Sequence, residues 1–392
     1  MIFLYKARLL CYTERKTRER IMFARLDEKL DEFLSLGVPW NDLVVYHKGK
    51  CVYRRFRGTL DLEGTVPVRG DERINIYSCS KVITCTAALM LYERGLFRLT
   101  DPLCDYLPEY AEMTVRDEDG VLHRAKNPIR ILDLFRMTAG FTYHLRSSAL
   151  NRLRRETKGV ASTRDFARYH AEEPLTSEPG ERWCYSLAHD VLAALCEVIS
   201  DTEFNAFCKQ NVFDAVGMPN TTFLLPSREY DTVAPHYAYN MDGCIAECGK
   251  FPIYRLGEGH ASGGAGCVST VDEYGRFLEA LRTEAFLSEN TLDLMSTDML
   301  TDEHRVTYGD GDYGYGLGVR CPRRGSAVSD FGWGGAAGAY FMVDRKNEIT
   351  AFYAQHVLNS PVQAKRGELR PIITEILCGE EAPRGENDKL KF

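Results

Sequence analysis

The stretch Ser78-Cys79-Ser80-Lys81 begins a run, Val82–Arg94, that is predicted to form one amphipathic helix ending before Gly95. The spacing of three places Lys81 beside Ser78 on one face of a helix. A serine hydroxyl is a poor nucleophile until a neighbouring group removes its proton, and a lysine one turn away can share that task. Free N–H groups at the helix N-terminus would also favour developing negative charge, by about 0.3–1 kcal/mol. The stretch therefore predicts serine acyl-transfer chemistry.

The segments around this tetrapeptide add context, because a Ser-x-x-Lys pattern alone is common. Before it, a hairpin is predicted with its turn at Lys48-Gly49. After it come Leu99–Glu109 and Ile131–Phe141. In this order the segments resemble the serine β-lactamase and penicillin-binding-protein family, from about Leu26 to about His356.

A second candidate catalytic residue, Tyr185, lies between a predicted turn at Pro179-Gly180 and a predicted helix. Most tyrosines in such positions are buried and structural. The resemblance instead implies that Tyr185 faces Ser78 and moves its proton. An unperturbed tyrosine has a pKa of about 10 and a lysine about 10.4, so neither alone is a base at neutral pH. Close pairing with Lys81 would remedy this, because the ammonium stabilises a tyrosinate while burial disfavours the charged lysine.

A glycine-rich segment, Phe331–Gly338, lies between a predicted strand ending near Val328 and a predicted strand at Tyr340–Asp344. The matching strand of β-lactamases carries Lys-Thr-Gly or His-x-Gly, whereas this chain has Trp333-Gly334-Gly335. Such glycines can simply mark a bulge or close strand packing.

The functional interpretation of this segment is an oxyanion hole. By resemblance, the N–H groups of Ser78 and Ala336 would receive the oxygen of the tetrahedral intermediate. One such donor can contribute about 3 kcal/mol to transition-state stabilisation.

Two departures from the β-lactamase pattern narrow the expected substrate. Tyr185-Ser186-Leu187 stands where β-lactamases have Tyr-x-Asn, so the amide that would bind an acylamino group is missing. Trp333 replaces the residue that faces a β-lactam carboxylate. This combination looks like the family VIII carboxylesterases and their acyltransferase relatives. The resemblance implies substrate contacts from Trp333, Gly334-Gly335, Leu187 and Phe141.

Composition and charge limit the possible partners and location. The net charge of -7 and the pI near 5.8 argue against a nucleic-acid surface. No uncharged apolar run reaches the roughly 18 residues of a membrane span. The N-terminal order of apolar and basic residues is the reverse of a secretory signal, and the odd count of 13 cysteines fits reduced thiols. We therefore expect a cytoplasmic protein.

Two sequence patterns resemble cofactor sites, one for zinc and one for a dinucleotide, but their surroundings do not fit either site. Cys244 and Cys248, with His236 and His260 nearby, are zinc-ligand types, but the residues between them form no compact finger pattern. Gly309–Gly314 formally matches a dinucleotide fingerprint, yet a glycine-rich strand rather than a helix is predicted after it. No metal and no cofactor are expected.

Two further segments carry local predictions. Thr270 or Ser269 is expected to cap a helix whose first turn contains Asp272 and Glu273. A basic run in residues 146–158 would most often be a solvated helix face, but it could instead border the substrate cleft and favour anionic esters. The run contains Arg146, Arg152, Arg154, Arg155 and Lys158.

The fold implied by the resemblance is α+β, with an antiparallel sheet flanked by helices and a mainly helical lobe. Residues 23–76 and 261–380 would build the α/β lobe, and residues 77–260 the helical lobe. The active site would lie in the cleft between them. Residues 1–22 are expected to form an N-terminal extension and residues 381–392 a flexible tail.

We therefore predict a serine hydrolase that cleaves carboxylic esters through an acyl-enzyme on Ser78, with Lys81 and Tyr185 as the base. The expected partner is a small-molecule ester. Three alternatives stay open: an acyltransferase to an alcohol, a β-lactamase or D-alanyl-D-alanine carboxypeptidase-type peptidase, and a non-catalytic binding protein on the same fold. An α/β-hydrolase is excluded because no serine lies in a Gly-x-Ser-x-Gly pattern.

Overall fold

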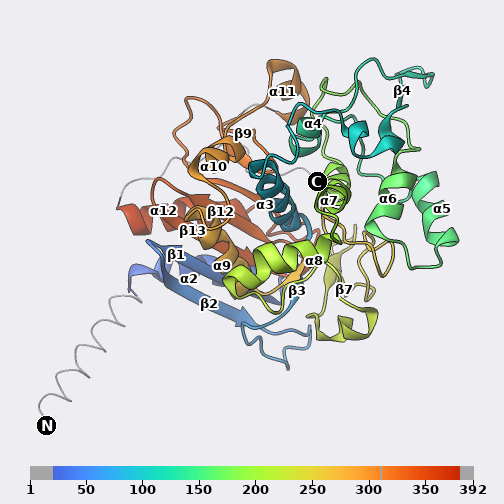
Figure 1. Ribbon diagram of the computed structural model, residues 1–392. Helices are drawn as coiled ribbons and strands as arrows, with labels where there is room; N and C mark the ends of the chain where they lie inside the picture. Colours follow the sequence, from blue (N-terminus) through green and yellow to red (C-terminus); the bar gives the residue numbers. More distant parts are fainter. Residues whose placement is uncertain (1–20, 310, 380–392) are drawn as a thin grey trace, which may run out of the picture.

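The computed structural model describes residues 21–309 and 311–379, and a seven-stranded antiparallel sheet lies at its centre (Figure 1). The strand order is β2-β1-β13-β12-β11-β10-β9, so strands from both ends of the described chain meet in the middle of the sheet. Its strands are β1 (Trp40–His47), β2 (Lys50–Gly58), β9 (Tyr313–Tyr315), β10 (Arg320–Pro322), β11 (Phe331–Gly334), β12 (Tyr340–Asp344) and β13 (Ile349–Ala354).

Helices surround this sheet, and most of them come from the chain between β2 and β9. The helices are α2 (Ala24–Ser35), α3 (Ser80–Glu93), α4 (Ile131–Phe135), α5 (Ser148–Glu156), α6 (Thr163–His170), α7 (Ala188–Ser200), α8 (Phe204–Cys208), α9 (Val271–Arg282), α10 (Glu289–Met295), α11 (Asp302–Tyr308) and α12 (Leu369–Cys378). Short strands form three small sheets: β3 (Ile74–Asn75) with β8 (Val268–Ser269), β4 (Thr114–Arg116) with β5 (Leu122–Arg124), and β14 (Val357–Leu358) with β6 (Tyr237–Tyr239) and β7 (Ile245–Glu247).

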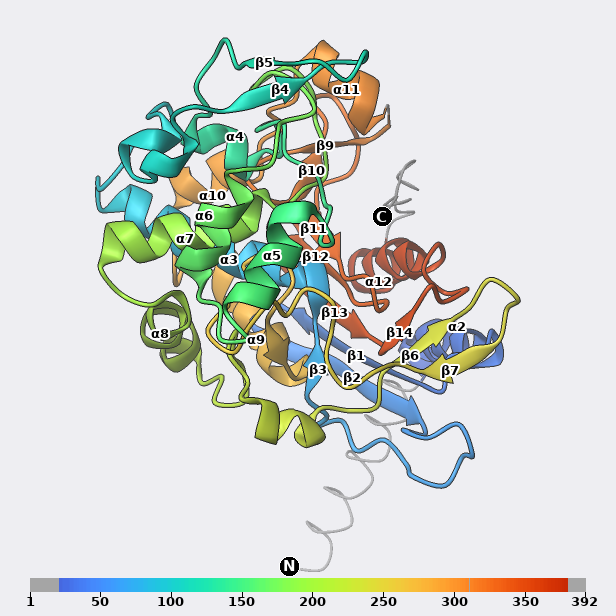
Figure 2. The same cartoon turned by 90° about the vertical axis from the view of Figure 1, so that its right-hand side faces the viewer.

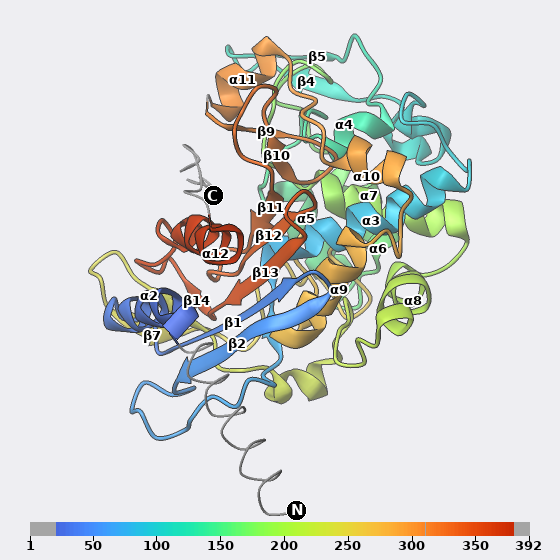
Figure 3. The same cartoon turned by 90° about the vertical axis from the view of Figure 1, so that its left-hand side faces the viewer.

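The two faces of the central sheet are covered by different helices. Leu43 and Val45 of β1 belong to the apolar cluster under α2 and α12, whereas Val44 between them belongs to the larger cluster that includes α9. This alternation follows from the period of two along a strand. Figure 3 shows α2 and α12 on one side of the sheet and α9 on the other.

The helices α5, α6, α7 and α8 gather beside the sheet (Figure 2), and α3 packs against α7. Eleven of the fourteen residues of α3 are buried. The predicted helix therefore forms, but it is buried nearly all round rather than amphipathic, because α3 lies between the sheet and the other helices.

Several local predictions are confirmed. The turn between β1 and β2 is Lys48-Gly49, with φ values of 52° and 78°. Thr270 caps α9 by accepting a hydrogen bond from the N–H of Glu273 at 3.2 Å. The strand expected near Val328 is wrong, because β11 begins at Phe331 and residues 323–330 connect it to β10.

The α+β class with an antiparallel sheet is as predicted. The division into two lobes stays a prediction. The expected extension at residues 1–22, except for residues 21 and 22, and the expected tail at residues 381–392 lie outside the described residues. Among the helices of the described ranges, none has both the length and the apolar character that a membrane span requires.

Candidate active site

Ser78 lies in a short 3-10 turn, Tyr77–Cys79, that leads directly into α3. Its side chain is buried, with 4% of the residue exposed, and it lines a cavity of about 510 Å³. Tyr77 has a φ of 49°, an unusual value for a residue with a side chain. This left-handed residue turns the backbone sharply just before Ser78, and such strained positions cluster at functional sites.

The structure brings the three predicted catalytic side chains together. The hydroxyl of Tyr185 donates to Ser78 Oγ at 2.5 Å, and Lys81 Nζ lies 3.4 Å from the same oxygen. Lys81 Nζ is also 4.7 Å from the centroid of the Tyr185 ring. The serine proton therefore has a direct path to the tyrosine, and the lysine charge lies against that tyrosine.

Lys81 is fully buried and has one further hydrogen-bond partner, the carbonyl of Gly264, while the carboxylate of Asp190 lies near enough to interact with its charge. Lys81 Nζ donates to the Gly264 oxygen at 2.6 Å. A Cβ on Gly264 would lie 2.4 Å from Asp190 Oδ2 and 3.3 Å from Lys81 Nζ, so only glycine lets these groups meet. Burial raises the pKa of the Asp190 carboxyl, while the Lys81 charge and a hydrogen bond from Ser262 oppose that shift.

Aromatic rings hold Tyr185 from two sides. Tyr143 stacks on it with ring centroids 5.3 Å apart and an interplanar angle of 3°, and Trp333 stacks with a centroid distance of 5.9 Å. Lys81 Nζ also lies 5.2 Å from the centroid of Tyr143. Two rings thus face the ammonium, which suits a desolvated cation. We call Ser78, Lys81, Tyr185 and Asp190 the catalytic wall.

Ala336 also lines the cavity, in the tight turn after β11. The N–H of Gly335 donates to Ala339 O at 2.8 Å, and the N–H of Gly338 donates to Gly335 O at 3.0 Å. Within residues 21–309 and 311–379, the N–H groups of Ser78 and Ala336 donate to no other group. Both are therefore available to an oxygen in the cavity.

Apolar and aromatic side chains form the rest of the cavity. Its lining residues are Tyr77, Ser78, Tyr143, Leu145, Tyr185, His236, Cys248, Gly249, Phe251, Pro252, Ile253, Tyr254, Ala336 and Leu358. None of these described residues is Asp, Glu, Lys or Arg. We call Cys248–Tyr254 the rim loop; its Phe251 and Ile253 are 46% and 48% exposed.

Other predicted substrate contacts lie away from the cavity. Phe141 is 3% exposed and packs edge-on against His170, and Leu187 is 2% exposed at the start of α7. Trp333 lies behind Tyr185 and is 2% exposed. Gly334 ends β11, and Gly335 is held in the turn. Helix geometry and strand register direct these side chains into the core. Their nearness in sequence to Tyr185 and Ala336 does not predict that direction.

The basic run of α5 and its neighbours also lies off the cavity. Arg154 donates to the carbonyl oxygens of Leu145 and Ile253, at 2.8 and 3.1 Å, so it ties α5 to two segments that line the cavity. Arg152 pairs with Glu172 on the surface. None of the five basic residues lines the cavity described here, which favours the solvated-face interpretation.

The residues considered for zinc have other surroundings. His236 Nε2 is 2.9 Å from the hydroxyl of Tyr77, and its ring stacks on His356. His260 packs against Phe166 in the core. No group of three or more His, Cys, Asp or Glu that could hold a metal occurs in residues 21–309 and 311–379.

The sequence interpretation missed Asp190, Gly264, Tyr143 and the rim loop. Asp190 lies in the first turn of α7, five residues after Tyr185, and it comes near Lys81 because α7 packs on α3. Its one sequence signal is an acidic residue on the apolar first turns of the helix. Such a residue needs a partner when it is buried.

Comparisons with known proteins agree with this geometry. A family model described as Beta-lactamase matches residues 26–372. The chain belongs to the β-lactamase family. The predicted resemblance and fold are thereby confirmed, and as a member of this family the chain is a serine hydrolase.

Relatives in this family include proteins with esterase and acyltransferase names. Esterase EstB of Burkholderia gladioli is 29% identical over 358 residues, which cover 82% of this chain and 87% of EstB. Acyltransferase calJ of Penicillium decumbens is 26% identical over 360 residues, covering 80% of this chain and 82% of calJ. Among solved structures, EstCE1, "a hydrolase with promiscuous acyltransferase activity", has a TM-score of 0.76 at 22% identity and covers 92% of this chain and 99% of its own.

Proposed function

We propose that this serine hydrolase is a carboxylesterase for neutral, apolar esters and that Ser78 forms the acyl-enzyme. The observation that carries the proposal is the hydrogen bond from Tyr185 to Ser78 at the end of a cavity without charged lining residues. A β-lactam or a peptide terminus would bring a carboxylate, and burying an ionised group without a partner is costly. A simple ester brings a carbonyl and apolar groups, which this cavity can accept.

In the proposed acylation step, Ser78 Oγ bonds to the ester carbonyl carbon and the carbonyl electron pair moves onto its oxygen. The Tyr185–Lys81 pair enters this step with one proton fewer than a phenol beside an ammonium, as tyrosinate with ammonium or as phenol with neutral amine. It takes up the Oγ proton, because its atoms lie 2.5 and 3.4 Å from that oxygen. The N–H groups of Ser78 and Ala336 receive the oxyanion. When the intermediate collapses, the bond to the leaving oxygen breaks and the pair returns the proton to the departing alcohol.

Deacylation repeats these steps with water. Water gives a proton to the Tyr185–Lys81 pair and attacks the acyl carbon, and the proton then returns to Ser78 Oγ as the acid leaves. An alcohol in the same place would complete an acyl transfer, the activity named in calJ. Measuring the ratio of acid to new ester in the presence of a short alcohol separates the two outcomes.

The test is covalent labelling and turnover by the purified protein. A fluorophosphonate probe should label the wild type and the matched control Ser80→Ala, but not Ser78→Ala. Ser80 is a suitable control because it is buried beside Ser78 and its Oγ instead accepts a hydrogen bond from the N–H of Cys267 at 3.0 Å. If Ser78→Ala were labelled, or if it kept more than a few per cent of the wild-type esterase activity, Ser78 could not be the nucleophile.

Substrate choice provides a second arm of the same test. We expect p-nitrophenyl butyrate to be hydrolysed at least about 100-fold more efficiently than nitrocefin, because two polar groups of the β-lactam would each lose roughly 1–3 kcal/mol without partners. Comparable kcat/KM values for the two substrates would instead support β-lactamase or peptidase chemistry.

A further inference from the structure

Arg366 reaches the predicted oxyanion hole from the side opposite the substrate. It begins a short 3-10 turn, Arg366–Glu368, just before α12, and only 2% of it is exposed. Its Nη1 donates to the carbonyl oxygens of Gly335 and Ala339, at 2.7 and 3.0 Å. Burying a charged arginine costs considerable desolvation free energy, and the two carbonyl oxygens that it binds are neutral acceptors. Its place beside the Gly335–Ala339 turn therefore suggests a function.

The reason lies in the covalent structure of the turn. The carbonyl of Gly335 and the N–H of Ala336 belong to one peptide group. We propose that Arg366 is a positioning residue that fixes this peptide and polarises it, which makes the Ala336 N–H a stronger donor to the oxyanion. The inference rests on the proposed function, because it assigns Ala336 to the oxyanion hole.

Polarisation follows from the chemistry of the hydrogen bond. A cationic donor on a carbonyl oxygen draws electron density from the whole amide, and hydrogen bonds in a chain strengthen one another. The guanidinium, the Gly335–Ala336 peptide and the oxyanion would form such a chain, with positive charge at one end and developing negative charge at the other. In a buried site this electrostatic interaction is much stronger than in water.

The charge of Arg366 persists at neutral pH. Burial lowers the pKa of its guanidinium to about 10, while the neighbouring thiol of Cys79 and phenol of Tyr340 act in the opposite direction. Even the lowered value leaves the group protonated at pH 7. Arg366 therefore presents a full positive charge to Gly335 throughout the neutral range.

The turn leaves little freedom for Gly335. A Cβ at this position would lie 2.5 Å from the carbonyl oxygen of Ile76, the residue that precedes Tyr77 and Ser78. The two proposed donors thus belong to backbone segments in close contact, and Arg366 holds the outer side of one of them. Replacing the arginine should change the donor while the nucleophile stays in place.

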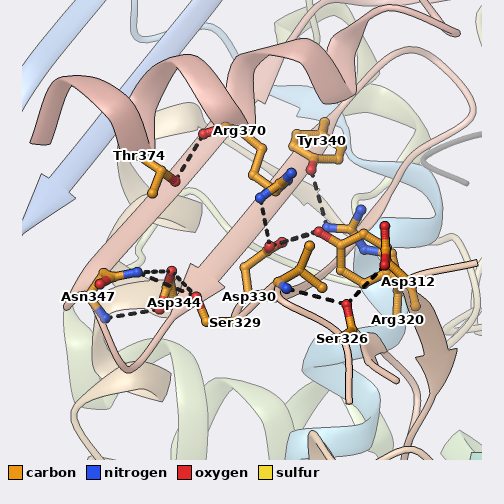
Figure 4. A network of polar contacts seen from close by, with 12 residues as sticks. Asp312, Arg320, Ser326, Ser329, Asp330, Tyr340, Asp344, Asn347, Arg370 and Thr374 are labelled. Atoms are coloured by element: carbon orange, nitrogen blue, oxygen red, sulfur yellow. Dashed lines mark hydrogen bonds and ion pairs between the residues drawn. The ribbon is translucent and has the colours of Figure 1, made fainter. Parts of the chain in front are cut away.

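Arg370 offers a matched control from the same region. It is 3% exposed, lies at the start of α12 and approaches Asp330 at 3.7 Å. Figure 4 shows Asp330 between Arg370 and Arg320, with Tyr340 also bonded to Arg320. The ion pair of Arg370 thus connects α12 to Asp330, whereas Arg366 donates to the Gly335–Ala339 turn. Loss of Arg370 should therefore lower stability without weakening the oxyanion hole.

The experiment compares Arg366→Lys, Arg366→Gln and Arg366→Met with Arg370→Met in the full chain. Lysine keeps a charged donor, glutamine keeps a neutral donor, and methionine keeps only bulk. We expect kcat for p-nitrophenyl butyrate to fall about 10-fold or more in Arg366→Met, somewhat less in Arg366→Gln, and less than about 3-fold in Arg366→Lys. KM should change little in all three, and kcat in Arg370→Met should stay near the wild-type value.

Binding of a tetrahedral mimic separates polarisation from general damage to the fold. Phenylboronic acid bonds through boron to Ser78 Oγ while the serine proton passes to the Tyr185–Lys81 pair, and its Ki should rise with the loss in kcat. The Ki of p-nitrophenyl butyl ether, which has no carbonyl, should stay within about 2-fold. Fluorophosphonate titration counts active sites, so a partly unfolded sample does not distort kcat.

The outcomes are distinct. Polarisation would be overturned if Arg366→Gln, Arg366→Lys and the wild type had equal kcat per titrated site and equal affinity for the boronate. It would also be overturned if kcat fell as much in Arg370→Met as in Arg366→Met. If Arg366→Met does not fold, the Gln and Lys pair decides the question alone. A wild-type protein that neither labels nor hydrolyses esters would instead contradict the proposed function.

Discussion

The catalytic wall and the rim loop border the same cavity but are built in opposite ways. Ser78, Lys81 and Asp190 are at most 4% exposed, whereas Phe251 and Ile253 of the rim loop are about half exposed. The wall is joined by short polar contacts: Tyr185 to Ser78, Lys81 of α3 to Gly264, and Asp190 of α7 to Ser262 in the same segment as Gly264. The rim loop combines ring contacts, such as Phe251 with Tyr230, with hydrogen bonds to its backbone, such as that from Arg154 to the Ile253 oxygen. From this difference we expect the wall to fix the proposed chemistry and the rim loop to set selectivity for apolar groups.

The largest expected loss of activity follows from removing the two proton-transfer groups of the wall. Tyr185→Phe and Lys81→Ala should each lower kcat by at least about 100-fold, the scale of general acid–base catalysis. Because Lys81 Nζ lies 4.7 Å from the Tyr185 ring and both approach Ser78 Oγ, we expect them to act as one unit. The double mutant should then be little worse than either single mutant. Steady-state kinetics in which the two losses multiply would place the residues in separate roles.

Much of the wall could be predicted from sequence, because its parts are local patterns. Ser78 and Lys81 are separated by one helical turn, and Tyr185 follows a recognisable turn before a helix. Asp190 could not be found in this way, since it meets Lys81 only through the packing of α7 on α3. Leu187 was misleading for the same reason: the helix that begins beside Tyr185 turns its neighbour into the core.

The rim loop and the oxyanion turn were harder to predict. Cys248 drew attention as a zinc-ligand type, whereas the structure places it among apolar residues at the cavity. The glycine cluster pointed correctly to close backbone contact, but nothing in the sequence connects Gly335 with Arg366 near the C-terminus. Contacts between segments far apart in the chain depend on the whole sheet and its covering helices, which periodicity does not specify.

Two buried histidines of the core, His170 and His260, predict how stability depends on pH. Burial lowers the pKa of His170 to about 4 and of His260 to about 3, so both are neutral in the folded protein near pH 7. In the unfolded chain the pKa is about 6.5, so the unfolded state binds more protons as the pH falls below this value. The stability that comes from burying these imidazoles in their neutral form is fully present above pH 6.5. It is lost progressively as the pH falls from 6.5 toward the pKa of the folded state.

His170 and His260 should therefore each cost about 2 kcal/mol of unfolding free energy at pH 5 relative to pH 7. Urea unfolding of wild type and His170→Asn at both pH values measures this, and the variant should lose less stability on acidification. His123, which is exposed, supplies the control His123→Asn. Equal pH dependence in all three proteins would show that His170 is not a source of the acid sensitivity.

The smallest expected effect concerns the rim loop. Phe251→Ala should raise KM for p-nitrophenyl butyrate a few-fold with little change in kcat, because a half-exposed ring contributes binding shared by substrate and transition state. The effect should shrink for p-nitrophenyl acetate, since each buried methylene contributes about 0.8 kcal/mol and the acetyl group has fewer carbons to cover. Met241→Ala, at a fully exposed residue outside the cavity, is the control. A loss in kcat as large as that of Tyr185→Phe would mean that the rim loop takes part in the chemistry, and the contrast between the two regions would fail.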